Sequence, residues 1–116
     1  MEHYIVARNA DSLFPYQGWP TIARDGNGVL YAAVSGHRLG HVCPFGKNYL
    51  YISKDEGKSW GMPVVIEEDK ERGYCYPAVF FTKDNSMLCG YCRGGKDDPN
   101  CLARLGIMKI GLDEME

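Results

Sequence analysis

Three side chains that commonly bind ligands stand close together at His37, Arg38 and His41. The guanidinium of Arg38 carries a planar pair of donors that matches the two oxygens of a carboxylate. The histidines titrate near neutral pH and could bind a metal, although without a nearby third ligand they serve equally as loop hydrogen-bonding residues. Arg93 stands in a comparable place later in the chain. For both arginines the alternative to a binding role is an ordinary surface position.

Two aromatic residues occupy equivalent places, each directly before a proline, at Trp19–Pro20 and Tyr76–Pro77. A large ring at the mouth of a channel can stack on a sugar. It can also simply pack against its neighbours, because aromatic side chains bury much apolar surface. Trp19 is therefore a candidate for ligand binding, with packing as the alternative.

One stretch has a specific spacing, Ser53-Lys54-Asp55-Glu56-Gly57-Lys58-Ser59-Trp60. It fits the Asp-box pattern S-x-D-x-G-x-[ST]-W at every fixed position, which are Ser53, Asp55, Gly57, Ser59 and Trp60. Physically this is a turn between two strands, in which an aspartate accepts backbone N–H groups and a glycine supplies conformational freedom. The tryptophan contributes a large apolar area for packing between sheets.

This stretch resembles the repeat of sialidases and other Asp-box (BNR repeat) β-propellers. The resemblance implies an all-β fold of four-stranded antiparallel blades, with the box as a structural turn on the face away from the ligand. It also implies an acidic carbohydrate such as sialic acid as the ligand, bound at the central channel. An active member would be a glycoside hydrolase of the exo-sialidase kind.

The residues with which sialidases act are matched here only in part. Gly18 stands where the resemblance places the first arginine of the substrate-binding triad, and residues 37–47 hold no carboxylate to act as the acid/base. Tyr76 stands where the tyrosine nucleophile would be, so it is the one catalytic candidate. Whether the chain is an enzyme stays open. The carboxylate-binding arginine would then be Arg38 or Arg93.

The elements that position these residues are short β-branched and aromatic runs bounded by turn residues, which indicate strands rather than helices. Two connections, Asp25–Gly28 and Lys83–Ser86, have the composition of tight hairpin turns. The expected strands are His3–Arg8, Trp19–Asp25, Val29–Gly36, Tyr49–Lys54, Pro63–Glu67, Tyr76–Thr82, Met87–Arg93 and Arg104–Ile110.

The chain also repeats itself over half its length, since Pro20 and Pro77 are 57 residues apart and Leu30 and Leu88 are 58 apart. A period of this size suits propeller blades. We expect one domain over residues 1–116, with blade one over about 18–68 and blade two over about 75–111. The N-terminal strand 3–8 would supply the fourth strand of blade two.

Composition excludes several classes of partner. The net charge is −2 and no basic run is present, so nucleic acid and anionic membrane surfaces have no electrostatic support. No apolar run approaches the roughly 20 residues of a membrane helix. An odd number of cysteines, five, and an N-terminus unlike a signal peptide favour reduced thiols and a cytoplasmic protein. We expect no cofactor and no metal.

Two blades are too few for a closed propeller, which needs about 4–8. The resemblance implies six, so we expect a homotrimer that closes one ring, and a monomeric fragment of a longer protein is the alternative. The corresponding functions are binding or processing of an acidic carbohydrate, and a non-catalytic scaffold or degenerate remnant.

Overall fold

The computed structural model describes residues 1–40, 46–67, 72–95 and 104–111, and for residues 67, 72–76, 93–95 and 104 it describes the backbone alone. The described part is all-β, as predicted. Its strands are β1 (Tyr16–Arg24), β2 (Leu30–Arg38), β3 (Lys47–Ser53), β4 (Val64–Glu67), β5 (Arg72–Phe81), β6 (Met87–Gly95) and β7 (Arg104–Ile110). Within these ranges no helix has the length and apolar character that crossing a membrane would take.

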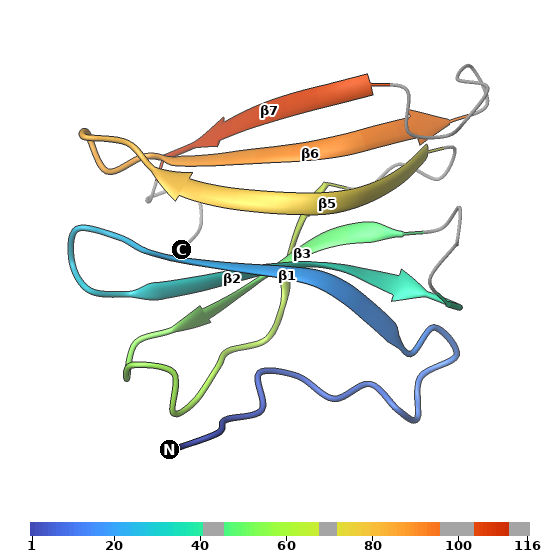
Figure 1. Cartoon of the computed structure of the whole chain (residues 1–116), viewed down its shortest axis with the longest axis horizontal. Helices are drawn as coiled ribbons and strands as arrows, with labels where there is room; N and C mark the ends of the chain where they lie inside the picture. The colour runs from blue at the N-terminus through green and yellow to red at the C-terminus, as the bar shows by residue number, and fades with distance from the viewer. Residues whose placement is uncertain (41–45, 68–71, 96–103, 112–116) are drawn as a thin grey trace.

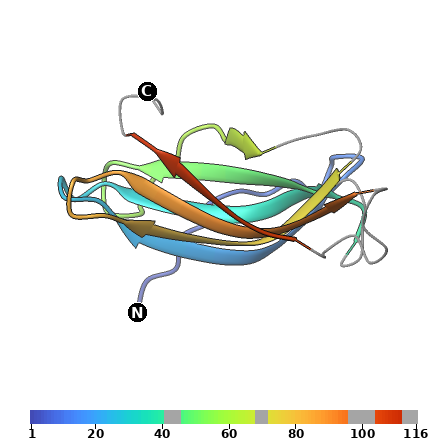
Figure 2. The same cartoon turned by 90° about the horizontal axis from the view of Figure 1, so that it is seen from above.

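The strands form two antiparallel sheets in chain order, one stacked above the other in Figure 1. The first, called sheet A, has the order β1-β2-β3-β4, and the second, called sheet B, has the order β5-β6-β7. Figure 2 shows the strands of both sheets running along the same long direction. The core lies between the sheets, because Ala33 and Leu50 of sheet A are buried together with Met87 and Cys89 of sheet B.

The prediction of an N-terminal strand over residues 3–8 is wrong. Residues 3–8 form no strand, and sheet B consequently has three described strands instead of four. The N-terminal segment instead lies below sheet A in Figure 1, on the side away from sheet B. Its polar side chains bond locally: the Tyr4 hydroxyl donates to Glu2 at 2.8 Å, and Arg8 pairs with Asp11 at 3.7 Å.

Both tight hairpins are present as predicted, and they share one geometry. The backbone N–H of Asp25 donates to the carbonyl of Val29, and that of Thr82 donates to the carbonyl of Ser86. The residue three positions after each of these donors has a positive φ, which is 85° at Gly28 and 62° at Asn85. These matched positions are 57 residues apart throughout, so Leu30 corresponds to Met87 and not, as the sequence suggested, to Leu88.

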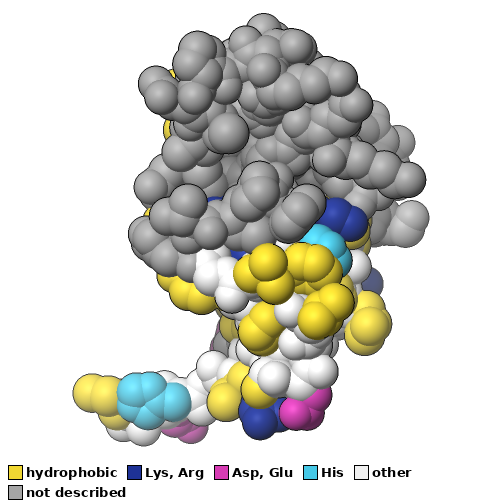
Figure 3. Space-filling model, turned by 90° about the vertical axis from the view of Figure 1, so that its right-hand side faces the viewer, with side chains coloured by type: hydrophobic (Ala, Val, Ile, Leu, Met, Phe, Trp, Pro, Cys, Tyr) yellow, Lys and Arg dark blue, Asp and Glu magenta, His cyan; other side chains and the backbone are white. Residues whose placement is uncertain are grey.

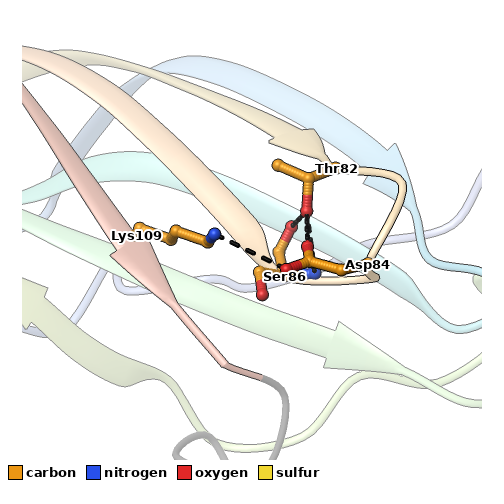
Figure 4. A network of polar contacts seen from close by, with 4 residues as sticks. All are labelled: Thr82, Asp84, Ser86 and Lys109. Carbon is orange, nitrogen blue, oxygen red and sulfur yellow. Dashed lines mark hydrogen bonds and ion pairs between the residues drawn. The ribbon is translucent and has the colours of Figure 1, made fainter.

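A polar network holds the second hairpin (Figure 4). The Thr82 hydroxyl donates to Asp84, and the Ser86 N–H donates to Thr82 Oγ1 at 3.1 Å. Lys109 of β7 pairs with Asp84 at 3.5 Å, and these bonds lower the pKa of Asp84, the Thr82 bond most. The two hairpins also touch, because the Gly26 N–H donates to Asn85 Oδ1 at 2.8 Å. This contact fixes the two sheets to each other at one end of the stack.

Candidate functional site

The Asp-box and the Arg38 region lie at opposite ends of sheet A. Strand β3 ends at Ser53, where the Asp-box begins, and this end also carries both tight hairpins. We call it the lower end, and it is on the left in Figure 1. Arg38 closes β2 at the other end, the upper end, which is on the right in Figure 1. Nine residues of extended strand separate the ends of β2, roughly 30 Å.

The Asp-box folds as its composition predicts. Asp55 Oδ1 accepts the backbone N–H of Ser59 at 2.8 Å, and Asp55 Oδ2 accepts the Ser59 hydroxyl at 2.5 Å. Ser53 Oγ donates to Asp55 at 2.9 Å and accepts the N–H of Gly57, whose φ is 91°. The Trp60 indole N–H donates to the Gly57 carbonyl at 2.9 Å. All five fixed positions of the motif are thus engaged within the turn, which supports a structural role.

The bonds around Asp55 make a pH-dependent prediction. The Ser59 hydroxyl, followed by the Ser59 N–H, lowers the pKa of Asp55 from 3.8 to about 2. A depressed folded pKa means that the carboxylate stabilises the fold above pH 3.8 and loses this effect as pH falls through about 2. Ser59→Ala should raise the pKa of Asp55 toward 3.8, measured by NMR titration of the carboxyl group. Asp55→Asn should make the free energy of unfolding depend less on pH between 3.8 and about 2. A pH dependence as steep as that of the wild type would contradict this assignment.

At the upper end, Arg38 is the centre of a cluster of aromatic and polar side chains. Its side chain is buried, with 5% exposure, and its Nη1 donates to Ser35 Oγ at 3.0 Å. The Arg38 guanidinium carbon lies 4.7 Å from the centre of the Trp19 ring, within the range of a cation–π interaction. Tyr16 tilts toward Trp19 with ring centroids 6.3 Å apart. The predicted arginine and aromatic residue therefore meet.

The same cluster includes His37, whose ring stacks on Phe14 with centroids 4.2 Å apart. His37 and Arg38 were predicted in a loop, but they are the last two residues of β2. The rings of Phe14, Tyr16, Trp19 and His37 are all half-buried, so each keeps part of its surface open. Figure 3 looks at this end and shows hydrophobic side chains gathered beside a histidine and a basic side chain.

The backbone under this cluster is strained. Trp19 and His37 have φ of 53° and 54°, a region that bulky residues rarely adopt and that costs about 1–3 kcal/mol each. The pairing of β1 with β2 also shifts register between Tyr16 and Gly18 and again between Gly18 and Thr21. Bulges of this kind aim side chains differently from a regular strand and are frequent beside functional sites. Neither feature was visible in the sequence.

The other predicted site residues are placed only in part. Arg93 lies on β6 opposite Tyr74, and Tyr76 lies at a register shift of β5, but their side chains are outside the described part. His41 lies outside the described residues altogether. Sequence reasoning missed Phe14, Ser35 and Asn48. Among the described residues no group of three metal-ligating side chains comes together.

Asn48 of β3 is the least expected member of the upper end. It lies directly opposite Ser35 in the β2–β3 ladder, so both side chains are on the same face of sheet A, the one that packs on sheet B. Asn48 is completely buried, and neither polar atom of its amide has a hydrogen-bond partner within the described part of the chain.

No protein-family model matches the chain, and no curated protein matches it. A solved structure does: a crystal structure of a protein of unknown function from Dyadobacter fermentans DSM 18053, with a TM-score of 0.69 and 23% sequence identity. The match covers 84% of this chain and 28% of the other. The chain therefore shares its fold with less than a third of that larger protein.

Proposed function

We propose that this chain is a unit of a sialidase-like Asp-box propeller and binds an acidic carbohydrate at the Arg38 cluster of its upper end. The observation that carries the proposal is the strained backbone at Trp19, which packs on the buried Arg38, and at His37, which precedes Arg38 in β2. Strain of this kind persists only where surrounding structure enforces it, and it concentrates at binding sites. The cytoplasmic location expected from the odd number of cysteines belongs to the same proposal.

The cluster offers the two kinds of contact that an acidic sugar needs. Partly exposed aromatic residues, Trp19 among them, can stack on the apolar face of a pyranose ring. The Arg38 guanidinium packs on the Trp19 ring and is shielded from water, so its attraction for a nearby carboxylate is screened less than that of an exposed charge. His37 adds a ring nitrogen that can donate a hydrogen bond.

Trp19→Ala is expected to weaken the binding of sialic acid by about tenfold or more, since a desolvated cation–π and stacking contact contributes about 1–2 kcal/mol. Binding should be measured by NMR chemical-shift titration, with a neutral hexose as the comparison ligand. Tyr4→Ala removes an exposed aromatic ring from the N-terminal segment and should leave the affinity unchanged. Equal affinity for the acidic and the neutral sugar, or an unchanged affinity in Trp19→Ala, would refute the proposal.

A scaffold function is the second candidate, and one observation favours it. The Arg38 guanidinium already donates to Ser35 and packs on Trp19, so it can serve purely to hold β1 against β2. This candidate predicts that removal of the charge at Arg38 or Arg93 leaves sugar affinity unchanged. Incubation of the wild-type chain with a sialoside, followed over time by product analysis, separates binding from turnover.

A further inference from the structure

We propose that Cys75 and Cys92 form a reversible disulfide bond between strands β5 and β6, which makes this chain sensitive to oxidants. The two cysteines lie directly opposite each other in the ladder of sheet B. The Cys92 thiol is free, so the structure has the pair in its unbonded state. The inference concerns sheet B alone and does not depend on carbohydrate binding.

A register shift in β5 brings the two cysteines opposite each other. Beyond the hairpin, the pairing of β5 with β6 is regular as far as Ala78, which is opposite Gly90. If the pairing continued without a shift, Cys75 would be opposite Arg93. The shift between Cys75 and Ala78 gives β5 one residue more than β6 over this stretch, and Cys75 is opposite Cys92 instead. The spacing of the cysteines along the sequence therefore did not reveal the pair.

The pair belongs to the exposed face of sheet B, the face turned away from the core. Side chains alternate between the two faces along a strand. Cys89 and Tyr91 of β6 are buried, with 1% and 7% exposure, whereas Cys92 is partly exposed. Leu105 of β7, directly opposite Cys92, is 79% exposed. Residues directly opposite each other share a face, so Cys75 belongs to this face as well, and a small reagent in solution can reach the pair.

The backbone of an antiparallel pair suits a disulfide bond. The Cα atoms of directly opposite residues are about 4.5–5.5 Å apart, and those of a disulfide bond are about 4.4–6.8 Å apart. The bond can therefore form while the strands stay paired. Cys89 has no such relation to another cysteine of the described strands, because the residues opposite it are Val79 and Met108.

Oxidation needs a co-reactant, and a small disulfide such as oxidised glutathione can supply it. The Cys92 thiolate attacks one sulfur of that molecule, forms a mixed disulfide and releases one thiolate. The Cys75 thiolate then attacks the Cys92 sulfur, closes the bond between the strands and releases the second thiolate. Each protein thiol gives up one proton, and each released thiolate takes one up. The cysteine pair loses two electrons and the small disulfide gains two, and an excess of reduced glutathione reverses both steps.

The bond would hold a part of the ladder that the register shift weakens. Pro77 stands within the shift and has no backbone N–H to donate to β6. A covalent link at Cys75 ties β5 to β6 beyond this point and also constrains the unfolded chain. The oxidised chain is therefore expected to unfold at a higher urea concentration than the reduced chain.

Peptide mapping of the full chain tests the inference. The wild type is incubated with oxidised glutathione and quenched in acid, and the remaining thiols are blocked under denaturing conditions. Trypsin, which cleaves after lysine and arginine, places Cys75 in the peptide 73–83 and Cys92 in the peptide 84–93. The second peptide also contains Cys89, so fragmentation of the linked peptides in a mass spectrometer assigns the bond to one of the two cysteines.

The expected result is a linked pair of these peptides, with the bond at Cys92, in chains that keep the single-chain mass of 13.0 kDa. Dithiothreitol should separate the peptides, and Cys92→Ser should abolish the link. Cys89→Ala is the matched control on the same strand and should retain the link, with circular dichroism to check that both variants fold. The inference would be overturned if the oxidised wild type gave no linked peptides, or if fragmentation placed the bond at Cys89. Linked peptides found only in species of twice the chain mass would also overturn it.

Discussion

Leu50→Ala is expected to lower the free energy of unfolding by about 2–5 kcal/mol, the range for deletion of a fully buried leucine side chain. Leu50 has no exposed surface and packs in the cluster that joins the two sheets, with Ala33 beside it on β2 and Met87 across on β6. The substitution removes both the transfer energy of the lost atoms and the contacts around the resulting cavity. Urea unfolding followed by circular dichroism measures the change.

Val65→Ala is the matched control. Val65 is on β4, next to Val64, which pairs with Leu50. Its side chain points to the outer side of sheet A and is exposed, so its truncation should cost well under 1 kcal/mol in the monomer. Similar effects of the two substitutions would mean that the space between the sheets is not the core of the fold.

Local chemistry explains why the hairpins could be predicted and the N-terminal strand could not. Asp25, Gly28 and Asn85 form their turns through their own backbone preferences, which the sequence displays directly. A strand over residues 3–8 would instead need a distant partner. Its run of aromatic and β-branched residues suits a strand, but the prediction assumed an open edge of sheet B, and the segment lies on the opposite side of the molecule.

The candidate site was predictable in its members and not in its geometry. Arg38 and Trp19 were singled out separately by residue type, and the structure brings them within 4.7 Å. That meeting depends on two register shifts in β1 and on positive φ at Trp19 and His37, where no glycine signals the conformation. Side chains such as Ser35 and Asn48 were missed because a polar residue inside a strand ordinarily indicates the solvated face.

Different side-chain contacts stabilise the two ends of the stack. At the lower end, side chains such as Asp55 bond to the turns in which they stand. At the upper end, Arg38 bonds to Ser35 of its own strand and packs on Trp19 of β1, so this packing depends on the pairing of β1 with β2. Buried polar side chains occur at both ends, and Asn48 is the extreme case because its amide has no partner among the described residues.

Asn48→Leu is expected to raise the free energy of unfolding by about 1–3 kcal/mol. A buried polar group without a partner costs about this much in lost hydration, and leucine has a similar branched shape without that cost. Asn48 has no exposed surface, and both polar atoms of its amide lack a partner among the described residues. The gain should appear as a higher urea midpoint with an unchanged slope.

The partner variant is Asn48→Asp, which keeps the size of the side chain and adds a charge that the sheet interface cannot hydrate. We expect it to destabilise the fold at pH 7 and to recover stability as the carboxyl group is protonated, because burial disfavours the charged form. Destabilisation by Asn48→Leu would contradict the prediction, since it would mean that the amide forms bonds in solution. In that case the change in sugar affinity of Asn48→Leu would tell whether those bonds belong to the Arg38 cluster. Stabilisation with unchanged sugar affinity would instead mean that Asn48 destabilises the fold and does not contribute to binding.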